Sequence, residues 1–328
     1  MEHHVYRNRA HIGLVGFGHI GGTLAHLLLL KKIAKVIAYD IHVDHARGKE
    51  RDLRQGLSIG GCHEPLLHIV DDIRHLTSCD VIVVTAGMAR RPNMEREELL
   101  HHNAKIIQDI GTSLGEIQAN GVILVVTNPV DIMTRWMQEV TGFSHHRVIG
   151  MAGVLDTGRL QLFLAEKLSV SPSDIHTCIL GAHNPSMIPI LSRTTVQGMP
   201  IHDWIRTHKN PPEKFLEMLQ TCIEDTKNEG ATIVNLLENG SAYYGPAHSI
   251  VAMIEAILSD GPHSLPVSAW TEERYGVPVY MGVQATLGRT GVMQIADMPL
   301  TPTEKNMLHD TGKTLQKSYE TFRKSFSS

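Results

Sequence analysis

The amino-acid sequence predicts an α/β fold, in which a doubly wound parallel sheet is followed by a domain of mixed α+β structure. Three observations indicate this fold. Short apolar runs alternate with helical patterns through the first half, several of these runs are apolar at every position, and the pattern changes near Gly153. Continuous apolar runs are typical of strands that are covered on both faces. We therefore expect two domains, formed by residues 1–152 and 153–328.

The first half of the chain supplies the elements of the parallel sheet. Its apolar runs predict strands at residues 12–15, 36–39, 66–70, 81–85, 122–127 and 148–149. The segments between them predict helices at residues 20–31, 44–55, 95–114 and 129–140. Such an alternation requires right-handed crossovers, so the strands are expected to run parallel to one another in a single sheet.

The second half of the chain has a less regular pattern. Residues 175–180, 186–193 and 277–281 are predicted as strands, and residues 212–238 and 303–326 as long amphipathic helices. Thr301 and Glu304 have the spacing of a capping box at the start of the last helix. In such a box each side chain accepts a hydrogen bond from the backbone N–H of the other residue.

The composition excludes several classes of function. Of the 328 residues, 42% are hydrophobic and 20% are charged, which is typical of a globular protein. The 30 Lys and Arg residues and the 34 Asp and Glu residues leave a net charge of −4. This balance gives no support to a nucleic-acid partner or a membrane-surface partner. No apolar run approaches the length of a membrane span.

Cysteine and histidine are not arranged as metal ligands. The four cysteines, at positions 62, 79, 178 and 222, contain neither a C-x-x-C pair nor a zinc spacing. Free thiols and a polar N-terminal segment without a signal-peptide pattern predict a cytoplasmic location. The 21 histidines include adjacent pairs rather than ligand sets, so no bound metal is expected. Besides His183, discussed below, His248 is the one histidine whose place in the fold needs to be determined.

A glycine-rich turn follows the first predicted strand and opens the first predicted helix. It reads Gly-x-Gly-x-x-Gly, and Asp40 ends the next predicted strand. Glycines at this spacing allow a tight turn, close approach of a pyrophosphate, and close packing of the helix on the strand. An acid at the position of Asp40 accepts hydrogen bonds from ribose hydroxyls and repels a 2′-phosphate. The alternative is a structural turn with an ordinary loop aspartate. The first interpretation predicts NAD, bound by Gly16, Phe17, Gly18, His19, Ile20, Gly21 and Asp40.

Two polar segments follow later strands, at the carboxyl edge where ligands of open α/β sheets bind. Arg90, Arg91 and Arg96 lie in one loop, where guanidinium groups could hold an anionic substrate and close over it as a lid. A solvated basic loop is the alternative. Asn128 ends another strand and could offer its amide to substrate or nicotinamide, although an Asn-Pro turn is common on its own.

The second half adds three candidate residues. Asp156 and Arg159 are three residues apart, so they share one face of a predicted helix, either as a surface ion pair or as a buried functional pair. His183 follows an apolar strand. A histidine beside a carboxylate can act as a general acid–base, and a structural histidine is the alternative.

Taken together and in this order, these segments resemble the lactate/malate dehydrogenase family, most closely its malate dehydrogenases. The resemblance runs from about Ala10 to about Phe322. Besides the glycine turn, the resemblance depends on four segments. The first, residues 85–103, contains Thr-Ala-Gly, then Arg-Arg-Pro-x-Met-x-Arg, and then Leu-Leu-x-x-Asn. The others are Val-Thr-Asn-Pro-Val-Asp (126–131), Val-Ile-Gly-Met-Ala-Gly-Val-Leu-Asp (148–156) and Gly-Ser-Ala-Tyr-Tyr-Gly-Pro-Ala (240–247). It implies a Rossmann-type NAD-binding domain followed by a mixed α+β substrate domain.

The resemblance also implies roles for individual residues. His183 would accept the proton in malate oxidation, and Asp156 would hold its imidazole and stabilise the charged form. Arg159 would bind the C1 carboxylate of the substrate, and Arg96 would polarise the reacting C2 oxygen. Arg90 stands where lactate enzymes generally carry glutamine, so the resemblance implies a second substrate carboxylate, and hence malate and oxaloacetate.

The remaining contacts and the assembly are implied in the same way. Asn103, Val126 and Thr127 would contact NAD, and Asn128 would contact the substrate and lie beside the cofactor. The substrate would be a small dicarboxylate. The protein would form a homodimer or a homotetramer, with no nucleic-acid or membrane partner.

The chain departs from the family pattern beside the expected catalytic histidine. The family usually reads His-Gly-Asp, whereas this chain reads His183-Asn184-Pro185, and Pro185 restricts the preceding residue and removes one N–H donor. Thr157-Gly158 replaces the more usual Ser-Ala. Two further hypotheses therefore stay open: a dehydrogenase of lactate or another 2-hydroxy acid, and a catalytically impaired NAD-binding protein.

Overall fold

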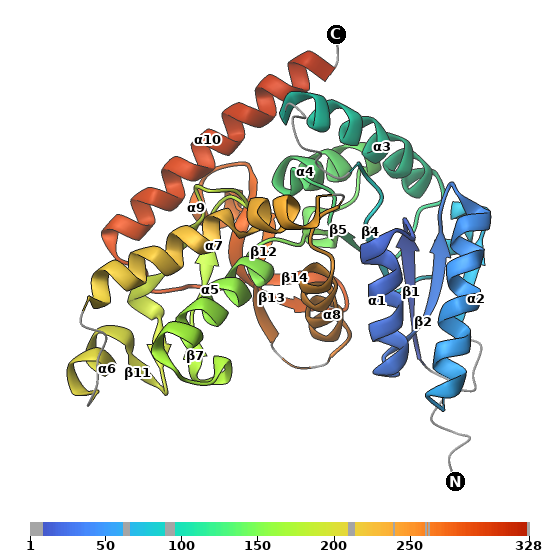
Figure 1. Cartoon of the computed structure of the whole chain (residues 1–328). Coiled ribbons are helices and arrows are strands. Elements are labelled where there is room, and N and C mark those ends of the chain that lie inside the picture. Colours follow the sequence, from blue (N-terminus) through green and yellow to red (C-terminus); the bar gives the residue numbers. More distant parts are fainter. Residues whose placement is uncertain are drawn as a thin grey trace. The chain divides into compact units, whose positions relative to one another are not determined.

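The structure is a computed structural model that describes residues 9–61, 66–88, 96–208, 214–238, 240–259, 261 and 263–326 (Figure 1). The chain divides into two compact units. The first unit comprises Met1–Met151, Ala242–His263 and Thr286–Gln294, and the second comprises Ala152–Ser241, Ser264–Ala285 and Ile295–Ser328.

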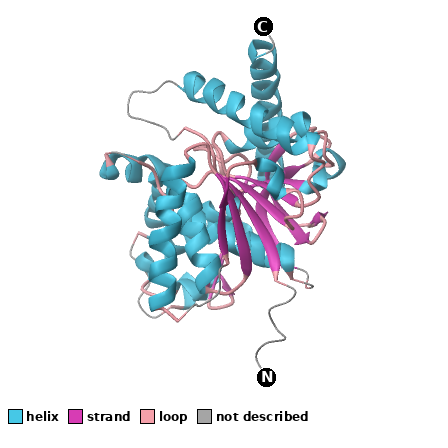
Figure 2. Ribbon diagram, turned by 90° about the vertical axis from the view of Figure 1, so that its right-hand side faces the viewer, coloured by secondary structure: helices cyan, strands magenta, loops and turns pink. Residues whose placement is uncertain are grey.

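The first unit is built on a parallel sheet. Its strands are β1 (Ala10–Val15), β2 (Ala34–Tyr39), β3 (Leu67–Val70), β4 (Val81–Val84), β5 (Val122–Val125) and β6 (Val148–Gly150). They lie in the order β3-β2-β1-β4-β5-β6, and every pair in this series is parallel. Figure 2 shows neighbouring strands in magenta with helices in cyan beside them. This is the strand order of a doubly wound dinucleotide-binding fold, so the predicted fold class is confirmed.

Five long helices accompany this sheet. They are α1 (His19–Leu30), α2 (Val43–Ile59), α3 (Arg96–Glu116), α4 (Val130–Thr141) and α8 (Tyr244–Leu258). The first four match the predicted helices to within four residues at each end. Helix α8 was not predicted, because it buries adjacent positions such as Ser249, Ile250 and Val251 and so lacks a clear amphipathic period. It packs against α1, where Lys31 and Glu255 form an ion pair of 2.8 Å.

The second unit combines helices with short antiparallel strands. Its helices are α5 (Gly153–Leu168), α6 (Ile201–Thr207), α7 (Phe215–Leu237), α9 (Glu272–Tyr275) and α10 (Pro302–Phe326). Its two-residue strands are β7 (Ile175–His176), β8 (Ile179–Leu180), β9 (Ile188–Pro189), β10 (Thr195–Val196) and β11 (Met199–Pro200). Strands β11, β10 and β7 form one small sheet, and β8 and β9 form another. The predicted mixed α+β character is therefore confirmed.

A continuous apolar core fixes the arrangement inside the second unit. Helix α5 contributes Leu160 and Leu164, α6 contributes Trp204, and α7 contributes Leu219, all of which are buried in one cluster. Since α5 also carries Asp156 and Arg159, this packing holds the polar face of the helix in a defined orientation.

The strand predictions of the second half need correction. Residues 175–180 form two separate strands, β7 and β8, which belong to different sheets. Of residues 186–193 only Ile188–Pro189 pairs, and Leu191–Arg193 forms a 3₁₀ turn. The strand expected at 277–281 is β13, which begins at Tyr280 and ends at Gly288, and β12 (His263–Trp270) and β14 (Gly291–Ile295) were not predicted. Two-residue strands such as β7, β8 and β9 depend on the partner strand more than on their own sequence pattern.

The two compact units are not contiguous in the sequence, and the expected division into domains 1–152 and 153–328 stays a prediction. The first segment of the first unit ends at Met151, and residues 242–263 and 286–294 also belong to that unit. Residues 242–263 belong to the first unit because α8, which lies within them, packs against α1. Among the helices of the described residues, none combines the length and the apolar character that crossing a membrane requires.

Candidate active site

Two glycines at the junction of β1 and α1, Gly16 and Gly21, have a structural reason to be glycine, and a third, Gly18, borders open space. Gly16 has φ +97°, a left-handed conformation that favours glycine. A Cβ atom on Gly21 would lie 2.2 Å from the carbonyl oxygen of Gly16, so α1 packs this closely only without a side chain. A Cβ atom on Gly18 would meet no protein atom within 4 Å. Open space therefore lies beside the backbone of Gly18, where a pyrophosphate group needs it.

The first turn of α1 offers free hydrogen-bond donors to a ligand. Gly18 is the N-cap of the helix and provides no side chain to cap it, so the first N–H groups stay available to an anion. Gly18 and His19 are exposed, and Ile20 is partly exposed. The Phe17 side chain is only 1% exposed, so this residue would meet a cofactor through its backbone.

Asp40 lies at the end of β2 and holds the glycine turn. Its Oδ2 atom accepts a hydrogen bond of 2.6 Å from the Phe17 N–H, and its Oδ1 atom accepts one of 2.8 Å from the His42 N–H. A carboxylate has about four lone-pair sites, so about two are left for ribose hydroxyls. The turn, the helix terminus and the acid together fit a dinucleotide.

A polar network joins the loops that follow β4 and β5. The buried side chain of Asn103 accepts a hydrogen bond of 2.7 Å from the Met88 N–H and donates one of 2.7 Å to the Asn128 carbonyl. Thr127 donates through its hydroxyl to the Ala86 carbonyl at 2.6 Å. Both residues organise the carboxyl edge of the sheet, where Val126 is buried and Asn128 is exposed.

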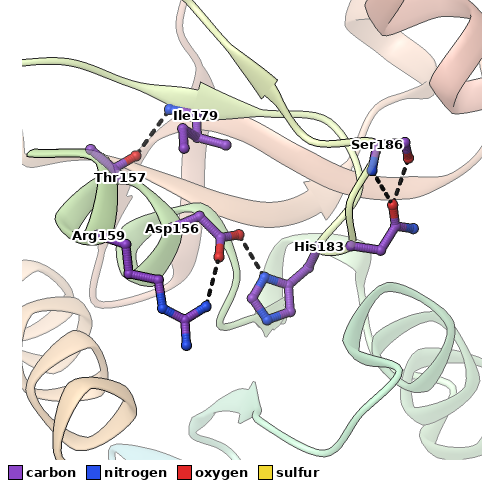
Figure 3. Close-up of polar contacts among 7 residues, drawn as sticks. Asp156, Thr157, Arg159, Ile179, His183 and Ser186 are labelled. Atoms are coloured by element: carbon purple, nitrogen blue, oxygen red, sulfur yellow. Dashed lines mark hydrogen bonds and ion pairs between the residues drawn. The ribbon is translucent and has the colours of Figure 1, made fainter. Parts of the chain in front are cut away.

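In the second unit, three of the predicted residues meet in one cluster (Figure 3). The Asp156 carboxylate is buried, with a side chain 2% exposed, and its Oδ2 atom lies 2.6 Å from the His183 Nδ1 atom. Its Oδ1 atom lies 3.5 Å from the Arg159 guanidinium. A carboxylate this deeply buried needs such partners to compensate for lost hydration. The interpretation of Asp156 and Arg159 as a surface ion pair is therefore wrong.

Two groups of the same cluster lie near the surface of the second unit. The Asp156 carboxylate accepts a hydrogen bond from Nδ1 of His183, so this contact does not involve the other ring nitrogen, Nε2. The Arg159 and His183 side chains are 15% and 13% exposed, so both reach the surface of the unit. Arg159 also lies beside α7, where a Cβ atom on Gly230 would come within 3.9 Å of its guanidinium nitrogens.

The unusual Asn184-Pro185 pair does not separate His183 from Asp156. The Asn184 side chain instead closes a local turn, since its Oδ1 atom accepts hydrogen bonds from the Ser186 N–H at 2.8 Å and from the Ser186 hydroxyl at 2.6 Å. The Asn184 N–H donates to the Ala182 carbonyl at 2.9 Å. The substitutions are therefore absorbed in an exposed turn next to the imidazole.

Two predicted substrate residues lie beyond this description. Arg90 falls outside the described residues, and Arg96 is described only by its backbone, as the first residue of α3. His248 is exposed, and its Nδ1 atom lies 3.0 Å from the Tyr244 carbonyl, a contact within α8. Across the part of the chain that the structure describes, no group of three or more His, Cys, Asp or Glu residues is arranged to hold a metal ion.

Two supporting residues were missed by the sequence analysis. Thr157 accepts a hydrogen bond of 2.9 Å from the Ile179 N–H and so ties α5 to the strand that leads to His183. Lys49, on α2, donates a hydrogen bond of 3.1 Å to the Phe17 carbonyl in the glycine turn. Neither contact could be predicted from the sequence, because each joins residues that are far apart in the chain.

Comparisons with known proteins agree with this geometry over nearly the whole chain. The family model of the lactate/malate dehydrogenase NAD-binding domain matches residues 10–150, and that of the family's alpha/beta C-terminal domain matches residues 153–325. The chain belongs to the lactate/malate dehydrogenase family. It is therefore an NAD-dependent oxidoreductase of this family, and its glycine turn fits that cofactor.

Solved structures of the family superpose closely on this chain. The malate dehydrogenase of Cryptosporidium parvum is 32% identical with a TM-score of 0.90, and the match covers 97% of this chain and 100% of the other. The lactate dehydrogenase of the same organism, solved with lactic acid and NAD, is 30% identical with a TM-score of 0.89, covering 96% and 98%. The malate dehydrogenase of Picrophilus torridus is 30% identical with a TM-score of 0.88, covering 98% and 99%.

Proposed function

We propose that this protein is an NAD-dependent malate dehydrogenase, which interconverts (S)-malate and oxaloacetate. The observation that carries the proposal is Arg90 in the sequence, next to Arg91 and six residues before Arg96. A guanidinium group binds a carboxylate through two parallel hydrogen bonds. A dicarboxylate needs one such group at each end, and Arg159 on α5 would supply the other.

His183 would be the general acid–base of the reaction. Its Nδ1 atom is held by Asp156 at 2.6 Å, so Nε2 would take the proton from the C2 hydroxyl of malate. The buried Asp156 carboxylate would stabilise the imidazolium that results. In the opposite direction, the imidazolium would return this proton to the C2 oxygen of oxaloacetate.

The other residues would bind and orient the reactants. When bound, NAD supplies the redox chemistry, as hydride acceptor for malate and as hydride donor in its reduced form. Arg159 would bind the C1 carboxylate, Arg90 the second carboxylate, and Arg96 the C2 oxygen. Losing the contact to the reacting oxygen would cost roughly 3 kcal/mol if it resembles an oxyanion-hole donor. The backbone of Val126, Thr127 and Asn128 would line the nicotinamide.

Lactate is the second candidate substrate, because lactate dehydrogenases are about as similar to this chain as malate dehydrogenases are. The deciding experiment compares oxaloacetate and pyruvate in steady-state assays with NADH. We expect oxaloacetate to be preferred, and Arg90→Gln to shift the preference toward pyruvate. Arg91→Gln, a change of the neighbouring arginine, is the matched control and should keep the preference. A preference for pyruvate in the unchanged protein would overturn the proposal.

A catalytically impaired NAD-binding protein is the third hypothesis, motivated by Asn184-Pro185. It predicts that the protein binds NADH but turns over neither substrate in a manner that depends on His183. The intact contact between His183 and Asp156 favours an active enzyme. Measured turnover with NADH and oxaloacetate that disappears in His183→Asn would exclude this hypothesis.

The assembly and location are part of the same proposal. We expect a homodimer or a homotetramer, which light scattering of the purified protein would measure. We also expect a cytoplasmic protein, since the three described cysteines, Cys79, Cys178 and Cys222, are buried free thiols. Fractionation of cells that express a tagged form would test the location.

A further inference from the structure

The backbone of Phe17, at the centre of the glycine turn, is held at both its N–H group and its carbonyl by charged side chains. Its N–H donates to the Asp40 carboxylate at 2.6 Å, and its carbonyl accepts a hydrogen bond of 3.1 Å from the Lys49 ammonium group. These contacts join β2 and α2 to the turn, although Lys49 is 32 residues from Phe17 in the chain. They fix the orientation of the backbone just before the N–H groups of Gly18 and His19, which would receive the pyrophosphate.

Lys49 and Asp40 also influence each other electrostatically. Burial lowers the pKa of Lys49, and the negative charge of Asp40 acts in the opposite direction. The ammonium group is therefore partly removed from water and lies near the carboxylate that would receive the adenosine ribose. Lys49 differs in this respect from the other cations of α2: Arg47 and Arg54 pair with Asp44 and Glu50 on the same helix, and Arg51 is exposed.

We propose that Lys49 is a specificity-determining residue of the cofactor site. Its ammonium group holds the turn in the conformation that binds NAD, and it is the cation that would bind the 2′-phosphate of NADP once the charge of Asp40 is removed. In the unchanged protein, Asp40 repels a 2′-phosphate and accepts the ribose hydroxyls. The preference for NAD is thus a balance between two opposite charges on neighbouring elements. This inference rests on the NAD site alone and does not depend on which 2-hydroxy acid the enzyme uses.

The test is a set of equilibrium fluorescence titrations with NADH and with NADPH, without substrate. Asp40→Ser removes the charge and keeps one oxygen, and Lys49→Met removes the ammonium group and keeps much of its length. We expect Asp40→Ser to bind NADPH about tenfold more tightly than the unchanged protein does, as a charge-assisted phosphate contact requires. In the double variant, Asp40→Ser with Lys49→Met, this gain should disappear, whereas Asp40→Ser with Lys49→Arg should retain it.

The controls separate this role from a general effect of charge or of folding. Arg51→Met removes a cation from the exposed face of the same helix and should leave both dissociation constants within about twofold. Lys49→Met alone should weaken NADH binding about threefold or more, because the Phe17 carbonyl loses its charged donor. If Lys49→Met fails to fold by circular dichroism, Lys49→Gln, which keeps a donor without the charge, replaces it in both variants.

Two results would overturn the proposal. One is an equal gain in NADPH affinity in Asp40→Ser with and without Lys49. The other is an absence of any gain in a folded Asp40→Ser protein that still binds NADH. Because no substrate is present, neither result depends on whether malate is the substrate of this enzyme.

Discussion

The glycine turn of the first unit and the His183 cluster of the second unit are built in opposite ways. The turn is a backbone site, in which Gly16, Gly18 and Gly21 create space and free N–H groups within six residues. The cluster is a side-chain site, in which His183 and Asp156 come from segments 27 residues apart and meet through one hydrogen bond of 2.6 Å.

The two sites also tolerate change differently. A single added carbon atom on Gly21 would lie 2.2 Å from the Gly16 carbonyl oxygen, whereas Asn184 and Pro185 replace the usual family residues without separating His183 from Asp156. At Gly21 the backbone site leaves no room for a side chain, since helix α1 and the turn are already in contact. A side-chain site depends on the few atoms that meet, so changes beside it can be absorbed by a turn.

The largest expected effect comes from removing the imidazole of the side-chain site. His183→Asn should lower kcat with oxaloacetate by about 10³-fold, because general acid–base catalysis is lost. The dissociation constant of NADH should stay within about twofold, since the turn is unaffected. His176→Asn, a change of an exposed histidine in the same unit, should leave kcat unchanged. Stopped-flow measurements of NADH oxidation would check both, and a His183→Asn enzyme with more than a tenth of normal kcat would contradict the proposed role.

The backbone site should respond most to Gly21→Ala. Overpacking strain of about 2 kcal/mol at the Gly16 carbonyl would displace α1 or the turn. If all of this strain opposes the binding of NADH, the dissociation constant of NADH would rise about 30-fold. Gly22→Ala is the matched control, because a Cβ atom there meets nothing within 4 Å. Titration of NADH fluorescence would measure both. Equal affinity of the Gly21 and Gly22 variants would show that close packing of α1 is not needed for binding.

A smaller effect is expected at a support of the side-chain unit. The Glu304 carboxylate accepts hydrogen bonds from the Thr301 N–H at 2.8 Å and from the Ser192 hydroxyl at 2.8 Å, so the predicted capping box is confirmed and extended. Burial acts to raise the pKa of Glu304, but these hydrogen bonds outweigh it and lower the pKa. Glu304→Gln should therefore lower the free energy of unfolding by about 1 kcal/mol at neutral pH.

The pH dependence of this effect has a defined sign. Since the pKa of Glu304 is lower in the folded state, the ionised carboxylate contributes stability above pH 4.5, its ordinary value, and loses it as the pH falls through the folded-state pKa. Urea unfolding at neutral pH and in acid should show the difference between Glu304→Gln and the unchanged protein shrinking in acid. Glu320→Gln, an exposed glutamate of the same helix, should show no such change. A difference that grows in acid would contradict this account.

The smallest effect is expected from restoring the family pattern beside the imidazole. The double change Asn184→Gly with Pro185→Asp should alter kcat by no more than about twofold, because the contact between His183 and Asp156 does not use these residues. A gain of tenfold or more in steady-state turnover would mean that the turn limits catalysis. The His183 cluster would then be as sensitive to substitutions at neighbouring residues as the glycine turn is.

Regular elements of the first unit were predictable because each carries its own pattern. Strand β4 is buried at all four positions, and its run of Val and Ile residues predicts that without knowledge of its neighbours. The two-residue strands β7 and β8 could not be predicted in this way. Their pairing depends on β10 and β9, which lie elsewhere in the chain, and not on the pattern of the segment itself.

The sequence by itself determined the doubly wound fold, the glycine turn with Asp40, and the identity of His183, Asp156 and Arg159 as candidates. These features are local, since they depend on periodicity, on glycine spacing, or on residue types that follow a strand. Only the tertiary structure decided that Asp156 is buried and bound to His183, and that Lys49 holds the Phe17 carbonyl. Burial and long-range hydrogen bonds depend on how distant elements pack, and a single stretch of sequence does not encode that packing.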